Sequence, residues 1–144
     1  MDLIKKYNLE PFEINVQSIE RTFFDKLFAI CDYHENKGYH QNSRHLYDIH
    51  KIWTSKNIEA EKIGALFYEI VEERRTKPNI NISSQKGYEL KRVLMHIANE
   101  DYYKSDYQEI TTKLLFGDAK INYETVKKSI FQILDSGIIP NNLE

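Results

Sequence analysis

The sequence predicts a mainly helical protein: about six helices in one compact, bundle-like domain, with a single β-strand near the N-terminus. Three observations indicate this fold class. The chain of 144 residues has the usual size of one domain. Its composition, 41% apolar and 29% charged, is sufficient to bury a core. Its five glycines and three prolines are too few for the frequent turns of a strand-rich sandwich or barrel.

The composition also limits the classes of function. With 20 Lys and Arg against 22 Asp and Glu, the formal net charge of -2 excludes a uniformly basic nucleic-acid binder, but not a local basic patch. No apolar run approaches the roughly 18 residues that a membrane span needs. The single cysteine, Cys31, cannot form an internal disulfide, which suits a reducing compartment. We therefore expect a cytoplasmic protein that does not contact a membrane.

The first element that the sequence predicts is a strand over Phe12–Val16, where apolar and polar side chains alternate strictly. One strand cannot satisfy its own backbone hydrogen-bonding groups. It must therefore pair weakly with residues 80–82 or join a sheet that this chain lacks. The poor strand character of residues 79–82 favours the second alternative. We expect a second copy of the chain, or a domain absent from it, to cover this strand.

Helical spacing of apolar residues predicts the remaining elements. The helices are expected at about residues 19–34, 44–53, 60–75, 88–99, 106–116 and 123–134. Residues suited to N-caps precede four of them, namely Ser18, Ser43, Ser105 and Asn122. Gly117 and Gly137 stand where the last two helices should end. No linker or internal repeat divides the chain, so residues 1–144 are expected to form one domain.

Two charged residues lie near the apolar faces of the first two helices. On a helical wheel Lys26 falls about 20° outside the apolar stripe of the first helix. It is either a lysine whose stem covers apolar surface or a cation placed in a cleft. Asp48 lies about 40° from the apolar face of the second helix. It either pairs with Arg44 on the surface or is partly buried and faces Lys26 or a ligand. The wheel alone favours, for Lys26, a stem that covers apolar surface and, for Asp48, a surface pair with Arg44.

Four of the histidines first suggest a metal site, because His34, His40, His45 and His50 fall within 17 residues. However, His45 and His50 would diverge by about 140° on one helix and so cannot share an ion. The sequence has no HExxH or paired-cysteine motif, no phosphate-binding glycine loop and no GxSxG motif. We therefore predict that these histidines do not form a metal site.

Two segments resemble the motifs of one protein family. Residues 20–27, ERTFFDKL, and residues 43–49, SRHLYDI, are similar to the RT-aromatic-x-acid-K and R-x-x-Y-D-aliphatic motifs of the AbiEii/AbiGii nucleotidyltransferase toxins. These proteins are the toxins of bacterial type IV toxin–antitoxin and abortive-infection systems. The order of the motifs, the 22-residue spacing from Lys26 to Asp48 and the preceding strand also agree. The resemblance covers nearly the whole chain.

The resemblance implies a polymerase-β-like transferase that moves a nucleotide from an NTP, with Mg²⁺, to an acceptor such as tRNA. It also implies a cognate antitoxin as a partner. Carried over by the motifs, Lys26 and Asp48 are catalytic residues, and Lys26 contacts the triphosphate. Arg44 and Arg21 are further nucleotide-binding residues. We expect Lys26 and Asp48 to approach one another between the first two helices.

The sequence departs from the family pattern at its start. The family has an N-terminal domain with a Gly-Ser or Gly-Gly-Thr motif followed by paired metal-binding aspartates. Residues 1–18 contain no glycine, and Asp2 is the only aspartate before Asp25. We therefore expect the chain to correspond to the C-terminal helical part alone and to be inactive by itself. The alternative is a non-catalytic helical interaction module that binds an antitoxin or RNA.

Overall fold

The computed structural model describes residues 18–55, 60–115, 121–141 and 143. Its elements in chain order are α2 (Ile19–Glu35), α3 (Arg44–Ser55), α4 (Ala60–Arg74), η2 (Ile82–Ser84), α5 (Leu90–Asn99), α6 (Lys104–Asp106), η3 (Tyr107–Thr111), α7 (Thr112–Leu114) and α8 (Tyr123–Asp135). The predicted mainly helical fold is confirmed for this part of the chain, which contains no strand. The strand expected at Phe12–Val16 lies outside the described residues.

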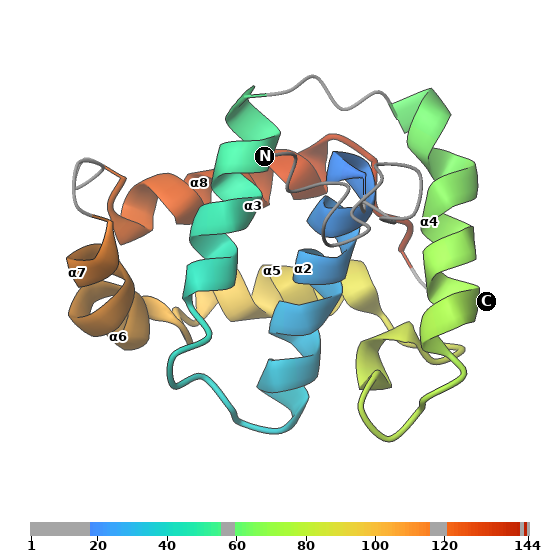
Figure 1. Ribbon diagram of the computed structural model, residues 1–144, viewed down its shortest axis with the longest axis horizontal. Helices are drawn as coiled ribbons and strands as arrows, with labels where there is room; N and C mark the ends of the chain where they lie inside the picture. Colours follow the sequence, from blue (N-terminus) through green and yellow to red (C-terminus); the bar gives the residue numbers. More distant parts are fainter. Residues whose placement is uncertain (1–17, 56–59, 116–120, 142, 144) are drawn as a thin grey trace, which may run out of the picture.

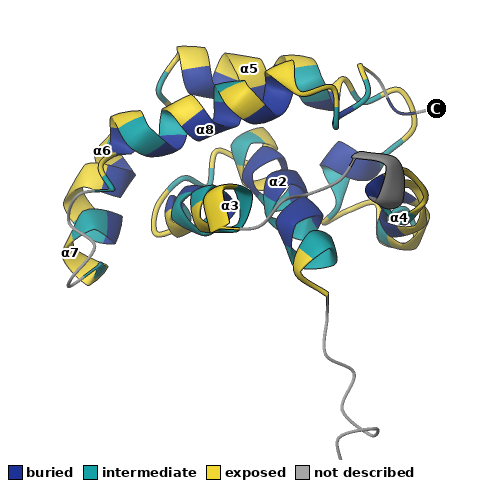
Figure 2. Cartoon of the chain, turned by 90° about the horizontal axis from the view of Figure 1, so that it is seen from above, coloured by how far each residue is buried: buried dark blue, intermediate teal, exposed yellow. Residues whose placement is uncertain are grey.

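The long helices form two layers. Helices α2, α3 and α4 lie roughly side by side in one layer, and α5 and α8 cross behind them in the other (Figures 1 and 2). The short α6–η3–α7 segment stands at one end of the molecule, beside α3 (Figure 2). The core fills the space between the layers, and the buried faces of the helices point into it (Figure 2).

Helix α2 is the central element of the core because its apolar stripe is wide. Phe23, Leu27, Phe28 and Ile30 of this helix are fully buried. Phe28 stacks against Phe67 of α4, with the ring centroids 5.6 Å apart. Aromatic pairs of this kind add to the free energy gained by burying their apolar area. The packing of α2 against α3, α4 and α5 fixes the positions of the charged side chains at the edges of its stripe.

Local capping signals explain where two of the helices begin. The Ser18 side chain accepts a hydrogen bond from the backbone N–H of Arg21, at 3.2 Å, and so begins α2. The Asn122 side chain accepts one from the N–H of Thr125, at 3.0 Å, and begins α8. Gly137 follows α8 with a φ of +80°, a conformation that suits glycine. These three predictions are confirmed.

The prediction for the fifth helix is wrong in its details. It begins at Lys104 rather than at Asp106, so Ser105 lies inside it and does not cap it. A π-helical turn, η3, interrupts it at Tyr107–Thr111. Ser43, expected to cap α3, instead places its hydroxyl 2.6 Å from the hydroxyl of Thr111, 68 residues away. Such long-range partners override local signals and cannot be read from the neighbouring sequence.

Residues 79–84 do not provide a partner strand. Ile82–Ser84 form the short 3₁₀ helix η2, which is buried against α2. The backbone N–H of Ser83 donates to the carboxylate of Asp32, at 2.8 Å, and the Ser83 hydroxyl donates to the carbonyl of Phe28, at 3.1 Å. The alternative of a weak strand at 80–82 is therefore wrong.

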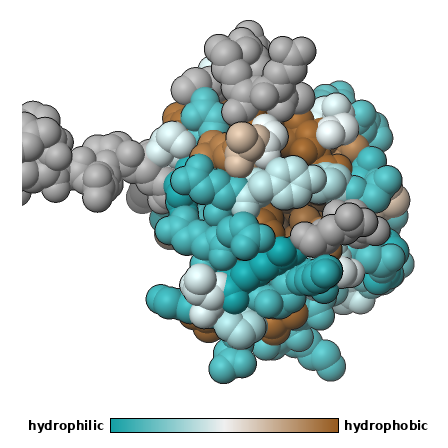
Figure 3. Space-filling model, turned by 90° about the vertical axis from the view of Figure 1, so that its right-hand side faces the viewer, coloured by the Kyte–Doolittle hydropathy of each residue, from teal (hydrophilic) through white to brown (hydrophobic). Residues whose placement is uncertain are grey.

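Apolar side chains also reach the surface on the side that carries α4. Tyr68 of α4 is 55% exposed. It borders a shallow hollow of about 230 Å³ that Gly64, Phe67, Gly137, Ile138 and Pro140 also line. Figure 3 looks onto this side and shows hydrophobic patches among mostly hydrophilic atoms.

Among the described residues, no helix has both the length and the apolar character that crossing a membrane requires.

Candidate functional site

A lysine and an aspartate meet between α2 and α3. The ammonium of Lys26 donates to Oδ2 of Asp48, and the two atoms are 2.9 Å apart. The two side chains are 24% and 27% exposed, so the pair is partly buried but open to solvent. The expectation that Lys26 and Asp48 approach one another is confirmed. Asp48 is thus paired with the neighbouring helix and not with Arg44 on its own surface.

The positions of both residues follow from the packing of α2 and α3. Fully buried neighbours, Leu27 beside Lys26 and Ile49 beside Asp48, anchor each helix in the core. The adjacent charged side chains then leave the helices at the rim of that core and meet across it. A charge pair at a protein rim interacts more strongly than one in open water because the local dielectric constant is lower. Part of this gain is offset by the cost of removing both groups from water.

His45 is a member of this site that the sequence analysis did not connect with it. It lies three residues before Asp48 on α3 and therefore on the same side of that helix. Its ring stacks on Tyr33, with the centroids 5.7 Å apart. Its Nδ1 is buried and has no hydrogen-bond partner within the described part of the chain. Burial, assisted by the nearby Lys26 cation, lowers the pKa of His45. The spacing of three residues between His45 and Asp48 was the signal in the sequence that could have connected His45 with this site.

Arg21, which the family resemblance assigns to nucleotide binding, lies elsewhere. Its guanidinium pairs with the carboxylate of Glu73 on α4. Because Lys26 follows it by five residues, the two side chains leave α2 about 140° apart. The structure therefore does not bring Arg21 together with the Lys26–Asp48 pair.

Arg44 lies close to the pair along α3. It is exposed and lines a hollow of about 420 Å³ together with Tyr47, Thr111, Leu114 and Leu115. It precedes Asp48 by four residues, which places the two side chains on neighbouring positions of one helix face. The structure thus brings three of the four predicted residues, Lys26, Asp48 and Arg44, to the same region.

A second charged cluster was missed altogether. The guanidinium of Arg74 donates to Asp32, at 2.6 Å, and to Asp25, at 3.2 Å, and its Nε donates to the hydroxyl of Ser84, at 3.1 Å. It also lies over the ring of Phe28, 5.1 Å from the centroid. This cluster joins α2, α4 and η2. The sequence contained one signal for this cluster. Phe28 precedes Asp32 by four residues, so Asp32 lies only about 40° from an apolar position of α2 that is fully buried.

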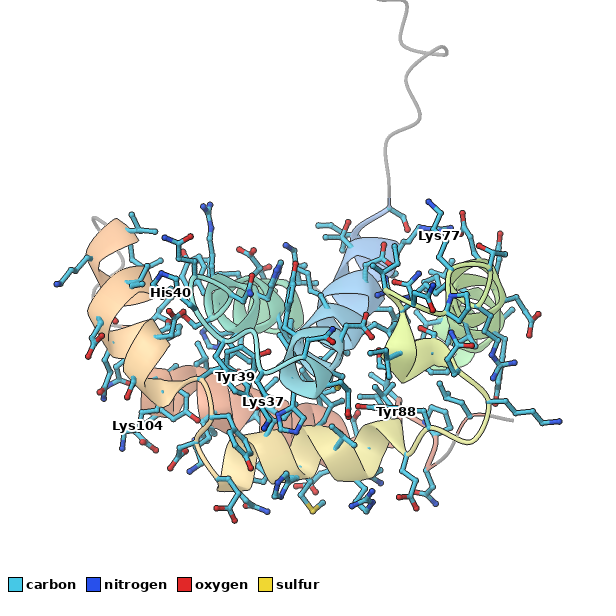
Figure 4. All side chains as sticks on the ribbon, turned by 90° about the horizontal axis from the view of Figure 1, so that it is seen from below. Lys37, Tyr39, His40, Lys77, Tyr88 and Lys104 are labelled. Atoms are coloured by element: carbon cyan, nitrogen blue, oxygen red, sulfur yellow. The ribbon has the colours of Figure 1, made fainter. Side chains whose placement is uncertain are left out.

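The described residues contain no group of three or more His, Cys, Asp or Glu side chains that could hold a metal ion. His34 and His50 have other roles in the structure. Nδ1 of His34 is 2.7 Å from the hydroxyl of Tyr39. Figure 4 labels Tyr39 on the loop between α2 and α3. Nδ1 of His50 is 2.6 Å from the hydroxyl of Ser129 on α8.

Acid should destabilise the protein through three of these histidines. Burial is the largest cause of the lowered pKa of His34, of His45 and of His50. Below about pH 6.5, the ordinary value for histidine, the unfolded chain therefore binds more protons than the folded one. The free energy of unfolding should be unaffected by these groups above that pH and should fall as the pH decreases below it.

Thermal unfolding followed by circular dichroism at pH 7.5 and pH 5.5 measures this effect. We expect a lower Tm at pH 5.5, and a smaller decrease in the His45→Gln variant. The control is His40→Gln, because the side chain of His40 is 78% exposed and its contact with Asp106, at 3.8 Å, is separate from the sites of His34, His45 and His50. Equal Tm values at the two pH values would contradict the prediction.

The fold and the site define a helical domain that presents a paired lysine and aspartate from two adjacent helices. Residues 2–134 match the family model described as nucleotidyl transferase AbiEii toxin, type IV TA system. Because the match covers nearly the whole chain, the protein belongs to the AbiEii family of type IV toxin–antitoxin nucleotidyltransferases. This membership indicates a cognate antitoxin as a partner. No curated protein and no solved structure gives a significant match to the chain.

Proposed function

We propose that this chain supplies the helical, triphosphate-binding part of a nucleotidyltransferase that moves a nucleotide from an NTP to an acceptor such as tRNA. The observation that carries the proposal is the contact between Lys26 and Asp48, 2.9 Å apart and open to solvent. In this proposal both residues are catalytic, and Arg44 assists in binding the nucleotide. The cytoplasm, where NTPs and tRNA are found, is the proposed place of action.

The proposed roles follow from the chemistry of the two groups. Nucleotidyl transfer needs cations beside the charge that develops on the phosphates. The ammonium of Lys26 has three N–H donors, of which one engages Asp48. The others can donate to phosphate oxygens while Asp48 holds the side chain in place. A lysine fixed in this way loses little side-chain entropy when the triphosphate binds.

The described carboxylates do not fit a two-metal site for Mg²⁺. Asp25 and Asp32 both accept hydrogen bonds from Arg74, away from Lys26. Among the described residues, Asp48 is the carboxylate that contacts Lys26, and one carboxylate cannot hold two metal ions. We propose that the metal-binding carboxylates come from a separate N-terminal domain. Either that domain or a second copy of the chain would cover the strand predicted at residues 12–16.

Triphosphate binding by the purified chain tests this proposal. Isothermal titration with inorganic tripolyphosphate should show binding that Lys26→Ala weakens about tenfold, because a hydrogen-bonded charge contact is lost. Lys128→Ala is the matched control, since Lys128 is an exposed lysine on α8. Circular dichroism would confirm that both variants fold.

Two results would contradict the proposal: no binding of tripolyphosphate by the unaltered chain, or equal affinities for the unaltered chain and Lys26→Ala. Either would favour the alternative of a non-catalytic module that binds an antitoxin or RNA. RNA binding by the isolated chain should in any case be weak and salt-dependent, because its formal net charge is -2.

A further inference from the structure

The hollow lined by Arg44, Tyr47, Thr111, Leu114 and Leu115 lies between α3 and the η3–α7 segment and has a volume of about 420 Å³. We propose that this hollow, called here the Arg44 hollow, is a nucleobase-binding subsite. The proposal rests on the proposed function, because it places the base next to a triphosphate held at Lys26.

The lining of the hollow has the chemistry that a nucleobase requires. Leu114 and Leu115 offer apolar surface, and Leu114 is 52% exposed. Tyr47 offers an aromatic ring, on which any base can stack. Arg44 adds a cation, while the hydroxyl of Thr111 is buried and engaged by Ser43. A few polar groups on a mainly apolar lining are typical of small-molecule sites of this volume.

Arg44 is the residue that connects the hollow with the Lys26–Asp48 pair. It lines the hollow and precedes Asp48 by four residues, or about 6 Å along the axis of α3. No hydrogen bond or ion pair of its guanidinium is formed within the described part of the chain. An exposed arginine between an apolar hollow and a lysine can bind the phosphate that follows a nucleoside.

The wall of the hollow is held firmly against the start of α3. The carboxylate of Asp106 accepts hydrogen bonds from the N–H groups of Gln41, at 2.8 Å, and Ser43, at 3.1 Å. The hydroxyls of Ser43 and Thr111 are 2.6 Å apart. The π-helical turn η3 ends at Thr111, and such turns occur frequently at functional sites. The hollow is thus preformed, which reduces the entropy lost on binding.

The base in the hollow would come from one of two sources, the NTP or the end of an acceptor RNA. NMR titration of the ¹⁵N-labelled chain distinguishes them. The ligands are ATP, GTP, CTP and UTP, a single-stranded RNA trinucleotide without a 5′-triphosphate, and inorganic tripolyphosphate. We expect nucleotides or the RNA to shift the amide signals of Thr111, Leu114 and Leu115, and tripolyphosphate to leave these signals unchanged.

Two variants test the hollow itself. Tyr47→Ala removes the stacking surface and should weaken binding of the base-containing ligand about tenfold, with tripolyphosphate binding unchanged. Leu114→Glu places a negative charge in the hollow and should have the same effect. It substitutes an exposed side chain, so it should not unfold the protein. Tyr68→Ala, which removes an exposed tyrosine of α4, is the control.

The outcomes separate this inference from the proposed function. If Lys26→Ala weakens binding of both NTP and tripolyphosphate, while Tyr47→Ala and Leu114→Glu weaken binding of neither the nucleotides nor the RNA, the subsite is overturned and the proposed function stands. If only the hollow variants weaken nucleotide binding, the subsite stands and the role of Lys26 is overturned. If neither nucleotides nor RNA shift the signals of the hollow, the subsite is overturned.

Discussion

Replacing Arg74 with alanine is expected to lower the free energy of unfolding by about 3–5 kcal/mol. The side chain of Arg74 is only 17% exposed, and its main partner, Asp32, is buried. Removing the guanidinium leaves the Asp32 carboxylate without its charged partner, although the N–H of Ser83 still donates to it. A buried charge that loses its partner is among the most destabilising changes in a protein.

Urea unfolding monitored by circular dichroism measures this effect. Arg92→Ala is the matched control, because Arg92 is 71% exposed and pairs with Glu89 on the surface, where loss of the contact should cost about 0.5 kcal/mol or less. Arg74→Lys should recover only part of the loss, since an ammonium cannot reproduce the fork of donors to Asp25, Asp32 and Ser84. A change below about 1 kcal/mol for Arg74→Ala would show that the cluster contributes little to stability.

The boundaries of the long helices could be predicted from the sequence because their determinants are local. The Ser18 cap, the apolar spacing and Gly137 all act within one or two helical turns. The predicted end of the first helix differs from that of α2, Glu35, by one residue. The meeting of Lys26 and Asp48 could also be anticipated, since both lie at stripe edges of consecutive helices and belong to related motifs.

The other features of the fold and of the candidate site depend on contacts between distant segments, which a single sequence does not reveal. The roles of Ser43 and Asp106 result from hydrogen bonds over 63 and 68 residues. Similarly, the hydroxyl of the fully buried Tyr103 donates to the carbonyl of Ile30, at 2.6 Å, 73 residues away. These partners are brought together only by the packing of the two helical layers. The same applies to the Arg44 hollow, whose walls belong to segments far apart in the chain.

A second large effect is expected in nucleotide transfer. The 144-residue chain by itself should transfer no measurable label to tRNA from any of the four NTPs in the presence of Mg²⁺. In-line transfer requires several carboxylates that hold metal ions beside the triphosphate and the attacking hydroxyl. At the Lys26–Asp48 pair the described residues supply one, Asp48, while Asp25 and Asp32 are bonded to Arg74. The sequence before α2 contains no pair of aspartates, since Asp2 stands alone there.

The assay separates nucleotide binding from turnover when it is combined with the titrations. Tripolyphosphate binding that depends on Lys26, together with absent transfer, is the expected combination. The positive control is a family member that contains both the paired aspartates and the helical part, assayed with the same tRNA and NTPs. Robust transfer by the 144-residue chain, lost in Asp48→Ala but kept in Lys128→Ala, would contradict the prediction. It would mean that this chain itself provides the carboxylates for the metal ions and that Asp48 acts with them.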